Sequence, residues 1–264
     1  MDLQLRNKPC LVTGSTAGIG LAIATELAGE GARVIVNGRT DARVKEAVQK
    51  IAALHPKAAL ETFVGDLSRA DEAEKIVARF PEVEVLVNNL GTYEVKPFDQ
   101  ITDADWQALI ETNFYSGVRL SRAYLPGMLK RNWGRIIFIS SESGIQIPVE
   151  MIHYGVTKTM QLALARGLAE ATKGTGVTVN SVLPGPTRSE GVEGFVKNMA
   201  AQQGKSPQDV EKEFFKTVRP SSLLQRFATN EEVAHLVTYV ASPLSSATNG
   251  AALRVDGGVV RSIV

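Results

Sequence analysis

The chain has 264 residues, 44% of them hydrophobic, and its 29 basic and 28 acidic side chains leave a formal net charge of +1. This composition is typical of a globular protein with a large core, and it lacks the basic excess that attracts nucleic acids or anionic membranes. A single cysteine, Cys10, excludes an intrachain disulfide, and with only three histidines the sequence does not predict a metal site.

Short β-branched runs alternate with longer amphipathic segments from residue 9 onward. Strands are predicted at 9–13, 33–36, 59–64, 85–87, 135–139, 177–182 and 251–255, and helices at 20–29, 41–54, 70–80, 103–130, 154–172 and 231–241. Several strands are continuous apolar runs, which indicates burial on both faces. The alternation predicts one α/β domain over residues 1–264, with a doubly wound, seven-stranded parallel Rossmann-type sheet and helices on both faces.

Residues 186–225 depart from this alternation. They contain Gly191, Gly194, Gly204, Pro207 and Pro220, helical stretches at 192–202 and 207–217, and no predicted strand. A long insertion after a buried strand is typical of a mobile substrate lid. An ordered surface excursion is the alternative.

A glycine-rich turn follows the first strand and leads straight into a helix. Gly14 allows a tight exit from the strand, Gly18 lets the backbone approach a pyrophosphate, and Gly20 permits close helix packing. Free N–H groups at the helix start would face the anion. The position of the turn predicts dinucleotide binding by Gly14, Ser15, Thr16, Gly18, Ile19 and Gly20.

Tyr154 and Lys158 lie four residues apart in a predicted helix, so their side chains share one face. Lowering a phenol pKa by about three units requires roughly 4 kcal/mol of preference for the phenolate. An ammonium at about 4 Å, with an effective dielectric near 20, supplies roughly that much. The pair is therefore a candidate general acid/base, the alternative being a tyrosine packed over a lysine stem.

Five motifs, in this order, resemble the short-chain dehydrogenase/reductase (SDR) family. They are Thr13-Gly-x-x-x-Gly-Ile-Gly20, Asn88-Asn89-Leu90-Gly91, Tyr154-x-x-x-Lys158, Pro184-Gly185 and Val255-Asp256-Gly257-Gly258, and they extend over nearly the whole chain. Leu90 departs from the usual alanine of the second motif. The resemblance implies an NAD(P)-dependent oxidoreductase in which Asn89, Gly91, Pro184, Gly185, Thr187 and Ser189 also contact the cofactor.

The resemblance also implies the remaining catalytic residues. Ser140 and Ser141 both end the fifth strand, and Ser141 is favoured because it lies 13 residues before Tyr154. Its hydroxyl would bind the substrate oxygen. Asn113 matches the helix asparagine that holds a water linking the lysine to solvent. Tyr154 would exchange a proton with the substrate oxygen, while Lys158 would lower the Tyr154 pKa and hold the nicotinamide ribose.

Residues at the end of the second predicted strand indicate which nicotinamide cofactor the protein prefers. Gly38 stands where an NAD-selective member carries an acid, and Arg39 follows, whose guanidinium can bind a 2′-phosphate. Ala17 stands where NADP-selective members often carry a second base. NADP(H) is therefore favoured over NAD(H). Asp66 and Leu67 resemble the family's adenine-contacting pair, the alternative for Asp66 being a helix cap.

The predicted substrate pocket is mostly apolar and is bordered by Tyr93, Ile145, Ile147, Met151, His153, Val192 and Phe195. His153 is predicted at the surface, because it precedes Tyr154 on a helix and points elsewhere. Arg188 is predicted to pair with Glu190 or Glu193, with an acidic substrate group as the alternative.

The substrate class expected is a small to medium, partly hydrophobic carbonyl or alcohol, with no nucleic-acid or membrane partner. The resemblance implies a homo-oligomer, a tetramer or dimer. The chain start has no apolar signal core and no apolar run spans a bilayer, so a cytoplasmic protein is expected. Alternatives are a non-catalytic dinucleotide sensor or scaffold, and an enoyl reductase or dehydratase on the same fold.

Overall fold

Seven parallel strands form a single sheet at the centre of the computed structural model, which describes residues 2–263 and all of their side chains except that of Phe195. The strands are β1 (Pro9–Val12), β2 (Arg33–Gly38), β3 (Ala59–Val64), β4 (Val85–Asn88), β5 (Gly134–Ile139), β6 (Val177–Pro184) and β7 (Ala252–Val255). Their order is β3-β2-β1-β4-β5-β6-β7, so the chain winds outward from β1 in one direction and from β4 in the other. The predicted doubly wound, seven-stranded sheet is confirmed.

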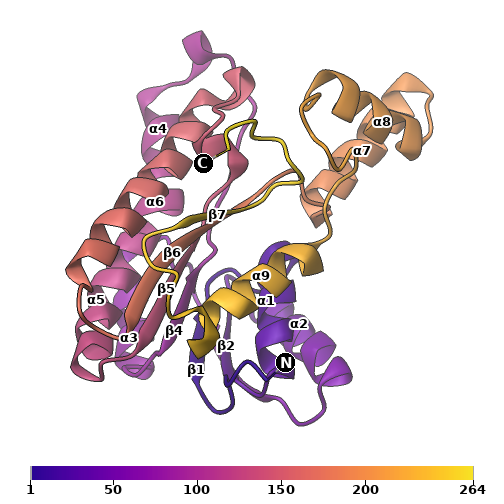
Figure 1. Cartoon of the computed structure of the whole chain (residues 1–264). Helices are drawn as coiled ribbons and strands as arrows, with labels where there is room; N and C mark the ends of the chain where they lie inside the picture. Colours follow the sequence, from indigo (N-terminus) through magenta and orange to yellow (C-terminus); the bar gives the residue numbers. More distant parts are fainter. Residues whose placement is uncertain (1, 264) are drawn as a thin grey trace.

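Helices cover both faces of the sheet (Figure 1). They are α1 (Gly18–Gly29), α2 (Asp41–Leu54), α3 (Ala70–Arg79), α4 (Asp103–Ile110), α5 (Ser116–Lys130), α6 (Ile152–Ala171), α7 (Glu190–Gln203), α8 (Pro207–Thr217) and α9 (Asn230–Ala241). One apolar core lies between the sheet and α1, α2 and α9, and a second lies under α3, α5 and α6. Within the described part of the chain, no helix is long and apolar enough to cross a membrane.

The predicted helix over 103–130 is interrupted. A single π-helical turn, Glu111–Tyr115, separates α4 from α5. Such a turn inserts one extra residue into the helical ladder, and it is often found at functional sites. Asn113 lies in its middle and is buried. Asparagine has a poor helix propensity, and Asn113 lies where the α-helix is broken by this π turn. The periodicity of the sequence does not reveal the break.

Helices α7 and α8 stand apart from the sheet as a separate layer (Figure 1). They pack around a small core of their own, made by Val196, Ala200, Val210, Phe215 and Phe227. The two helices fall within the predicted lid segment. A self-contained core allows such a pair to shift as one unit against the rest of the domain.

Charged residues on this layer do not pair as predicted. Arg188 pairs with Glu211 of α8 at 2.5 Å, not with Glu190 or Glu193. Glu190 pairs instead with Arg43 of α2 at 2.8 Å. The prediction was wrong because it considered only neighbours in sequence, whereas α8 folds back alongside the start of α7.

Candidate active site

The predicted site residues gather at the carboxyl ends of the strands, around a cavity of about 650 Å³. Ten of the predicted residues line this one cavity: Ile19, Asn89, Gly91, Ser141, Tyr154, Lys158, Pro184, Gly185, Thr187 and Ser189. They come from the first turn of α1, the end of β6, the loops after β4, β5 and β6, and α6. In open α/β sheets, ligands bind at this edge, next to the point where the strand order reverses.

The glycine turn has the compact geometry that a pyrophosphate requires. Gly14 and Gly18 have φ values of 60° and 53°, in the left-handed region that favours glycine. A Cβ atom on Gly20 would lie 2.4 Å from the Gly14 carbonyl oxygen, so only glycine fits there. No side chain caps the start of α1, which leaves its first N–H groups for an anion. The turn therefore fits a dinucleotide.

Two polar side chains hold this turn in place. Ser15 is fully buried; its Oγ donates to the Val12 carbonyl at 2.8 Å and accepts from the Asn37 amide at 2.9 Å. The Asn37 Oδ1 accepts from the Gly14 amide at 3.0 Å, while its Nδ2 donates to carbonyls of the β3 end. Ser15 thus braces the turn through its side chain. Asn37 was missed from the sequence, although a polar residue ending an apolar strand is a usable signal.

The end of β2 has no room for an acid at residue 38. A Cβ atom there would lie 2.3 Å from Cγ2 of Thr16. Arg39, the next residue, is exposed, and no carboxylate of residues 2–263 pairs with it. The unpaired guanidinium of Arg39 therefore follows a position, residue 38, at which an acidic side chain would collide with Thr16.

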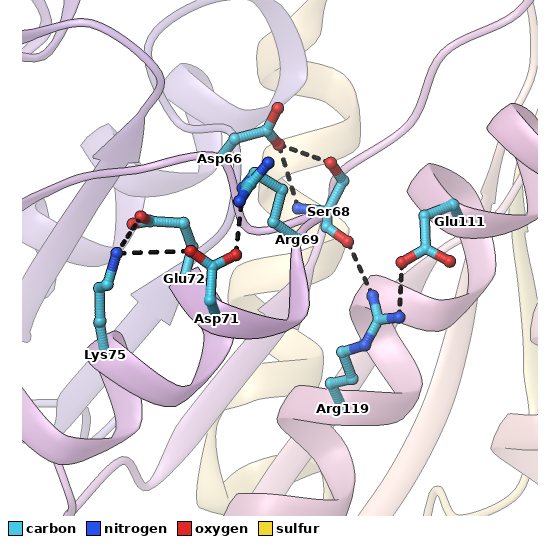
Figure 2. Close-up of polar contacts among 8 residues, drawn as sticks. All are labelled: Asp66, Ser68, Arg69, Asp71, Glu72, Lys75, Glu111 and Arg119. Atoms are coloured by element: carbon cyan, nitrogen blue, oxygen red, sulfur yellow. Dashed lines mark hydrogen bonds and ion pairs between the residues drawn. The ribbon is translucent and has the colours of Figure 1, made fainter.

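Asp66 follows β3 and lies in a turn shown in Figure 2. Its Oδ1 accepts from the Ser68 amide at 3.1 Å and from the Ser68 hydroxyl at 2.7 Å. Arg119 donates to the Ser68 carbonyl at 2.7 Å and pairs with Glu111 (Figure 2). Asp66 therefore stabilises this turn through one oxygen, while the side chain of Leu67 is fully buried in the core.

Leu90, the departure from the family motif, packs against the glycine turn. Its Cδ2 would lie 3.2 Å from a Cβ on Gly14, and its side chain contacts the core under α3, α5 and α6. Its amide donates to Thr13 Oγ1 at 3.0 Å, as the Asn89 amide does at 2.8 Å. The larger side chain thus fills core space and leaves the turn intact.

Ser140 and Ser141 have different hydrogen-bond partners. The Ser140 Oγ donates to the Lys158 carbonyl of α6 at 2.9 Å. The Ser141 Oγ accepts from the Ser143 amide at 3.1 Å and retains its proton for a further bond. The nearby Ser141 side chain acts to lower the pKa of Tyr154. This arrangement leaves Ser141 as the serine that faces the reacting group.

The side chain of Asn113 joins the π turn to the loop after β4 and to α6. Its Oδ1 accepts from the Thr92 amide at 2.8 Å, and its Nδ2 donates to the Thr92 carbonyl at 2.9 Å and to Thr157 Oγ1 at 3.0 Å. The side chain is therefore fully engaged, and the Asn113 carbonyl points to α6.

Gln161 connects that carbonyl to Lys158. Its Nε2 donates to the Asn113 carbonyl at 2.5 Å, and its Oε1 accepts from the Lys158 Nζ at 3.4 Å. Gln161 is 1% exposed, so both bonds are shielded from water. Sequence reasoning missed this residue. The signal was a polar side chain three residues after Lys158, on the same buried helix face.

The two ionisable groups of the motif are perturbed in opposite directions. Burial lowers the pKa of Lys158 to about 7. Burial also raises the pKa of Tyr154 to about 12, against the opposing influence of the Ser141 side chain. The Lys158 Nζ lies 5.6 Å from the Tyr154 ring centre and donates to the Ile139 carbonyl at 2.9 Å. The pKa of Tyr154 thus shifts upward, opposite to the predicted direction, because burial is its largest influence and the Lys158 ammonium is not among the influences on it.

The predicted substrate residues divide into two groups. Tyr93, Met151 and Val192 line the cavity, and the Tyr93 ring centre lies 6.0 Å from that of Tyr154. Ile145 and Ile147 are exposed and do not line it. The side chain of Phe195 lies outside the described residues.

The prediction of a surface position for His153 was wrong. Its side chain is fully buried and packs edge-on against Trp106 of α4, with ring centres 5.9 Å apart. It does point away from Tyr154, but that direction faces α4 and not solvent. Neither ring nitrogen has a hydrogen-bond partner among the described residues.

Comparisons with known proteins agree with the fold and the motifs. A family model described as short chain dehydrogenase matches residues 8–200. The uncharacterized oxidoreductase YvaG of Bacillus subtilis (strain 168) is 48% identical over the full length of both chains. A D-beta-hydroxybutyrate dehydrogenase of Cupriavidus necator is 33% identical, covering 97% of this chain and 99% of that protein.

Among solved structures, an L-sorbose reductase from Gluconobacter frateurii, complexed with NADPH and L-sorbose, is similar over 100% of both chains. Its TM-score is 0.93 and its sequence is 27% identical. The family model covers well over half of the chain, and the curated relatives cover nearly all of it. The chain therefore belongs to the short-chain dehydrogenase/reductase family of oxidoreductases.

Proposed function

We propose that this protein catalyses hydride transfer between NADP(H) and the carbonyl or carbinol carbon of a small to medium, partly hydrophobic molecule. One observation carries the proposal. Ser141, Tyr154 and Lys158 line the same cavity as Asn89 and Gly185, which end the neighbouring strands. A proton donor and the predicted nicotinamide contacts thus border one space, as the reaction requires.

The residues present fit a nicotinamide dinucleotide. The turn from Gly14 to Gly20 would hold the pyrophosphate, Asp66 would reach the adenine with its second oxygen, and the loop after β6 would border the nicotinamide. When bound, the cofactor supplies or accepts the hydride.

NADP(H) is favoured at the adenosine ribose. Arg39 is exposed and unpaired within residues 2–263, and Thr16 excludes an acid at residue 38. A guanidinium binds phosphate through two parallel hydrogen bonds, whereas a carboxylate would repel it. The NADPH bound to the L-sorbose reductase of similar fold supports the same choice.

Tyr154 is the proposed general acid/base. With a pKa of about 12, the phenol is protonated at neutral pH and can donate to a substrate carbonyl oxygen. Ser141 would donate a second hydrogen bond to the same oxygen and stabilise the charge that develops on it. Lys158 would supply positive charge beside the ring, and Asn113 holds the loop after β4 against α6.

The test is a cofactor titration followed by a carbonyl panel. Tighter binding of NADPH than of NADH, with NADPH oxidation by ketones, is the expected result. Binding of NADPH without turnover of any carbonyl would favour a dinucleotide sensor instead. Turnover of enones alone would favour an enoyl reductase. Size-exclusion chromatography with light scattering gives the molar mass of the same preparation and so tests the proposed homo-oligomer.

A further inference from the structure

One wall of the cavity is a stripe of side chains along α7. The residues of α7 that line the cavity are Val192, Val196, Met199 and Gln203. Because successive members are three or four residues apart, they lie on one face of the helix. At a rise of about 1.5 Å per residue, the stripe from Val192 to Gln203 is about 16 Å long. The cavity therefore has a long wall that is apolar up to its last member.

The stripe begins beside the proposed proton donor. A Cβ on Gly191, the second residue of α7, would lie 3.8 Å from the Tyr93 hydroxyl. The Tyr93 ring centre in turn lies 6.0 Å from that of Tyr154, and both rings line the cavity. The start of α7 is thus close to the reacting group, and Gln203 is the end of the stripe that lies farthest from it along the helix.

Helix α8 supplies a second wall. Its residues that line the cavity are Val210, Glu213, Phe214 and Thr217. The part of the cavity bounded by these residues and by the α7 stripe is called the α7–α8 groove below. Val192, Met199 and Phe214 are only partly buried by the small core of this layer. Their remaining apolar surface is available to a substrate.

Ion pairs fix α8 near both of its ends. Near its start, Glu211 pairs with Arg188 at 2.5 Å. Just after its end, the Arg219 Nε donates to Glu142 Oε1 at 3.0 Å, and Arg219 also pairs with Glu150 at 3.1 Å. The position of this wall is therefore set by contacts within the protein.

The charged residues of the cavity offer no free cation to an acidic substrate. Among the described residues that line it, the cations are Lys158 and Arg219. Lys158 belongs to the proposed catalytic group, and Arg219 is already paired with two carboxylates. Glu213 is paired with Lys205, outside the cavity lining. A carboxylate lying along the α7 stripe would lose hydration without gaining a counterion, which is unfavourable.

We propose that the α7–α8 groove binds an uncharged, unbranched aliphatic chain attached to the reacting carbonyl carbon. An extended chain advances about 1.2 Å per bond, a third of the advance per residue of an extended polypeptide, so about 13 bonds match the stripe. The substrate class is then a ketone with a linear chain of about ten carbons, or the corresponding secondary alcohol in the oxidative direction. The inference rests on the proposed function, because it names the substrate of the same site.

A series of methyl ketones tests the effect of chain length, with the intact protein and saturating NADPH. The value of kcat/KM should rise roughly threefold or more at each two-carbon step from 2-butanone to 2-decanone, because burying one methylene favours binding by up to about fourfold. A value that stays constant or falls beyond 2-hexanone would overturn the proposal.

Three ketones of equal carbon number separate shape and charge from total apolar content. 2-Octanone should have roughly fivefold higher kcat/KM than cyclohexyl methyl ketone, because a ring places fewer carbons along the stripe. It should have roughly tenfold higher kcat/KM than 7-oxooctanoate, whose carboxylate would lie in the groove. A value for either compound equal to that of 2-octanone would contradict the proposal.

Met199→Trp places a larger side chain in the middle of the stripe. The ratio of kcat/KM for 2-decanone to that for 2-butanone should fall roughly fivefold, because the longer chain loses buried methylenes. Asn198→Trp is the matched control, because Asn198 is exposed and does not line the cavity, and it should keep the wild-type ratio.

An unchanged ratio in Met199→Trp would contradict the assignment of the groove. The wild-type series tests the proposal even if this variant misfolds. Absence of turnover with every ketone would instead reject the proposed function, and this inference with it.

Discussion

The Lys158 ammonium lies 5.6 Å from the centre of the Tyr154 ring, and both residues line the same cavity. Replacing Tyr154 with Phe removes the proposed proton donor and leaves the ring. The expected result is a loss of kcat of at least 100-fold, since general acid catalysis contributes about 10²–10⁴-fold. Steady-state NADPH oxidation measures this, with NADPH binding by fluorescence as the control. A variant that keeps more than a tenth of the wild-type turnover would show the assignment to be wrong.

Gln161 is expected to position Lys158 and to favour its charged form, because its Oε1 accepts from Nζ. Gln161→Met removes that acceptor, so the Lys158 pKa should fall further below its value of about 7. The alkaline decline of kcat should then move to lower pH, with roughly tenfold lower kcat near pH 7.5 and little change in KM. Gln161→Glu should move the decline to higher pH. A purely structural role would lower activity equally at every pH.

The buried Lys158 should destabilise the fold at neutral pH. Its folded pKa of about 7 lies below the unfolded value of about 10.4, so between these values the unfolded state binds more protons. The contribution of Lys158 to the free energy of unfolding therefore becomes more favourable as the pH rises from about 7 to about 10.4. Lys158→Met should raise the free energy of unfolding by a few kcal/mol at pH 6.5, since each unit of pKa shift corresponds to about 1.4 kcal/mol. At pH 10 the same substitution should raise it by much less. Urea titrations at both pH values measure it. The exposed Lys130→Met variant should show no such pH dependence.

Arg39 should discriminate between the two nicotinamide cofactors. Arg39→Ala is expected to weaken NADPH binding at least tenfold, about 1.4 kcal/mol, because a guanidinium–phosphate contact is lost. NADH binding should change less than twofold. Lys45→Ala, which removes an exposed cation from α2, the helix that follows Arg39, is the control for general charge effects. Equal losses for NADPH and NADH would rule out a 2′-phosphate contact.

His153 is a fully buried ring with two unpartnered nitrogens. Replacing a buried, unpaired polar group with an apolar one is neutral or stabilising. His153→Leu is therefore expected to raise the free energy of unfolding by about 1 kcal/mol, as measured by urea titration of the purified protein. Trp106→Leu, which removes only packing from the same contact, should lower it. Destabilisation by both changes would mean that the histidine has a polar partner in the assembled protein.

Much of the fold could be predicted because strands buried on both faces are continuous apolar runs. The seven strands were placed within two residues at each end, as for β6, predicted at 177–182 and observed at Val177–Pro184. The motif residues were identifiable because the spacing of Ser141, Tyr154 and Lys158 resembles a known pattern. Their catalytic roles stay predictions.

Contacts between distant segments could not be predicted in the same way. The pairing of Arg188 with Glu211 depends on how α8 folds back, and the burial of His153 depends on α4. The pKa of Tyr154 depends on how much water its ring loses, which sequence spacing does not encode. The π turn around Asn113 arises from competition between helix hydrogen bonds and side-chain bonds to Thr92 and Thr157.

The contact between residue 38 and Thr16 has a consequence for evolution and engineering. Because a Cβ on residue 38 would lie 2.3 Å from Cγ2 of Thr16, an acid cannot be introduced there in one step without distorting the glycine turn. A side chain added at residue 38 therefore requires Thr16 to move or to be replaced. A design that places an acid there should pair Gly38→Asp with Thr16→Gly.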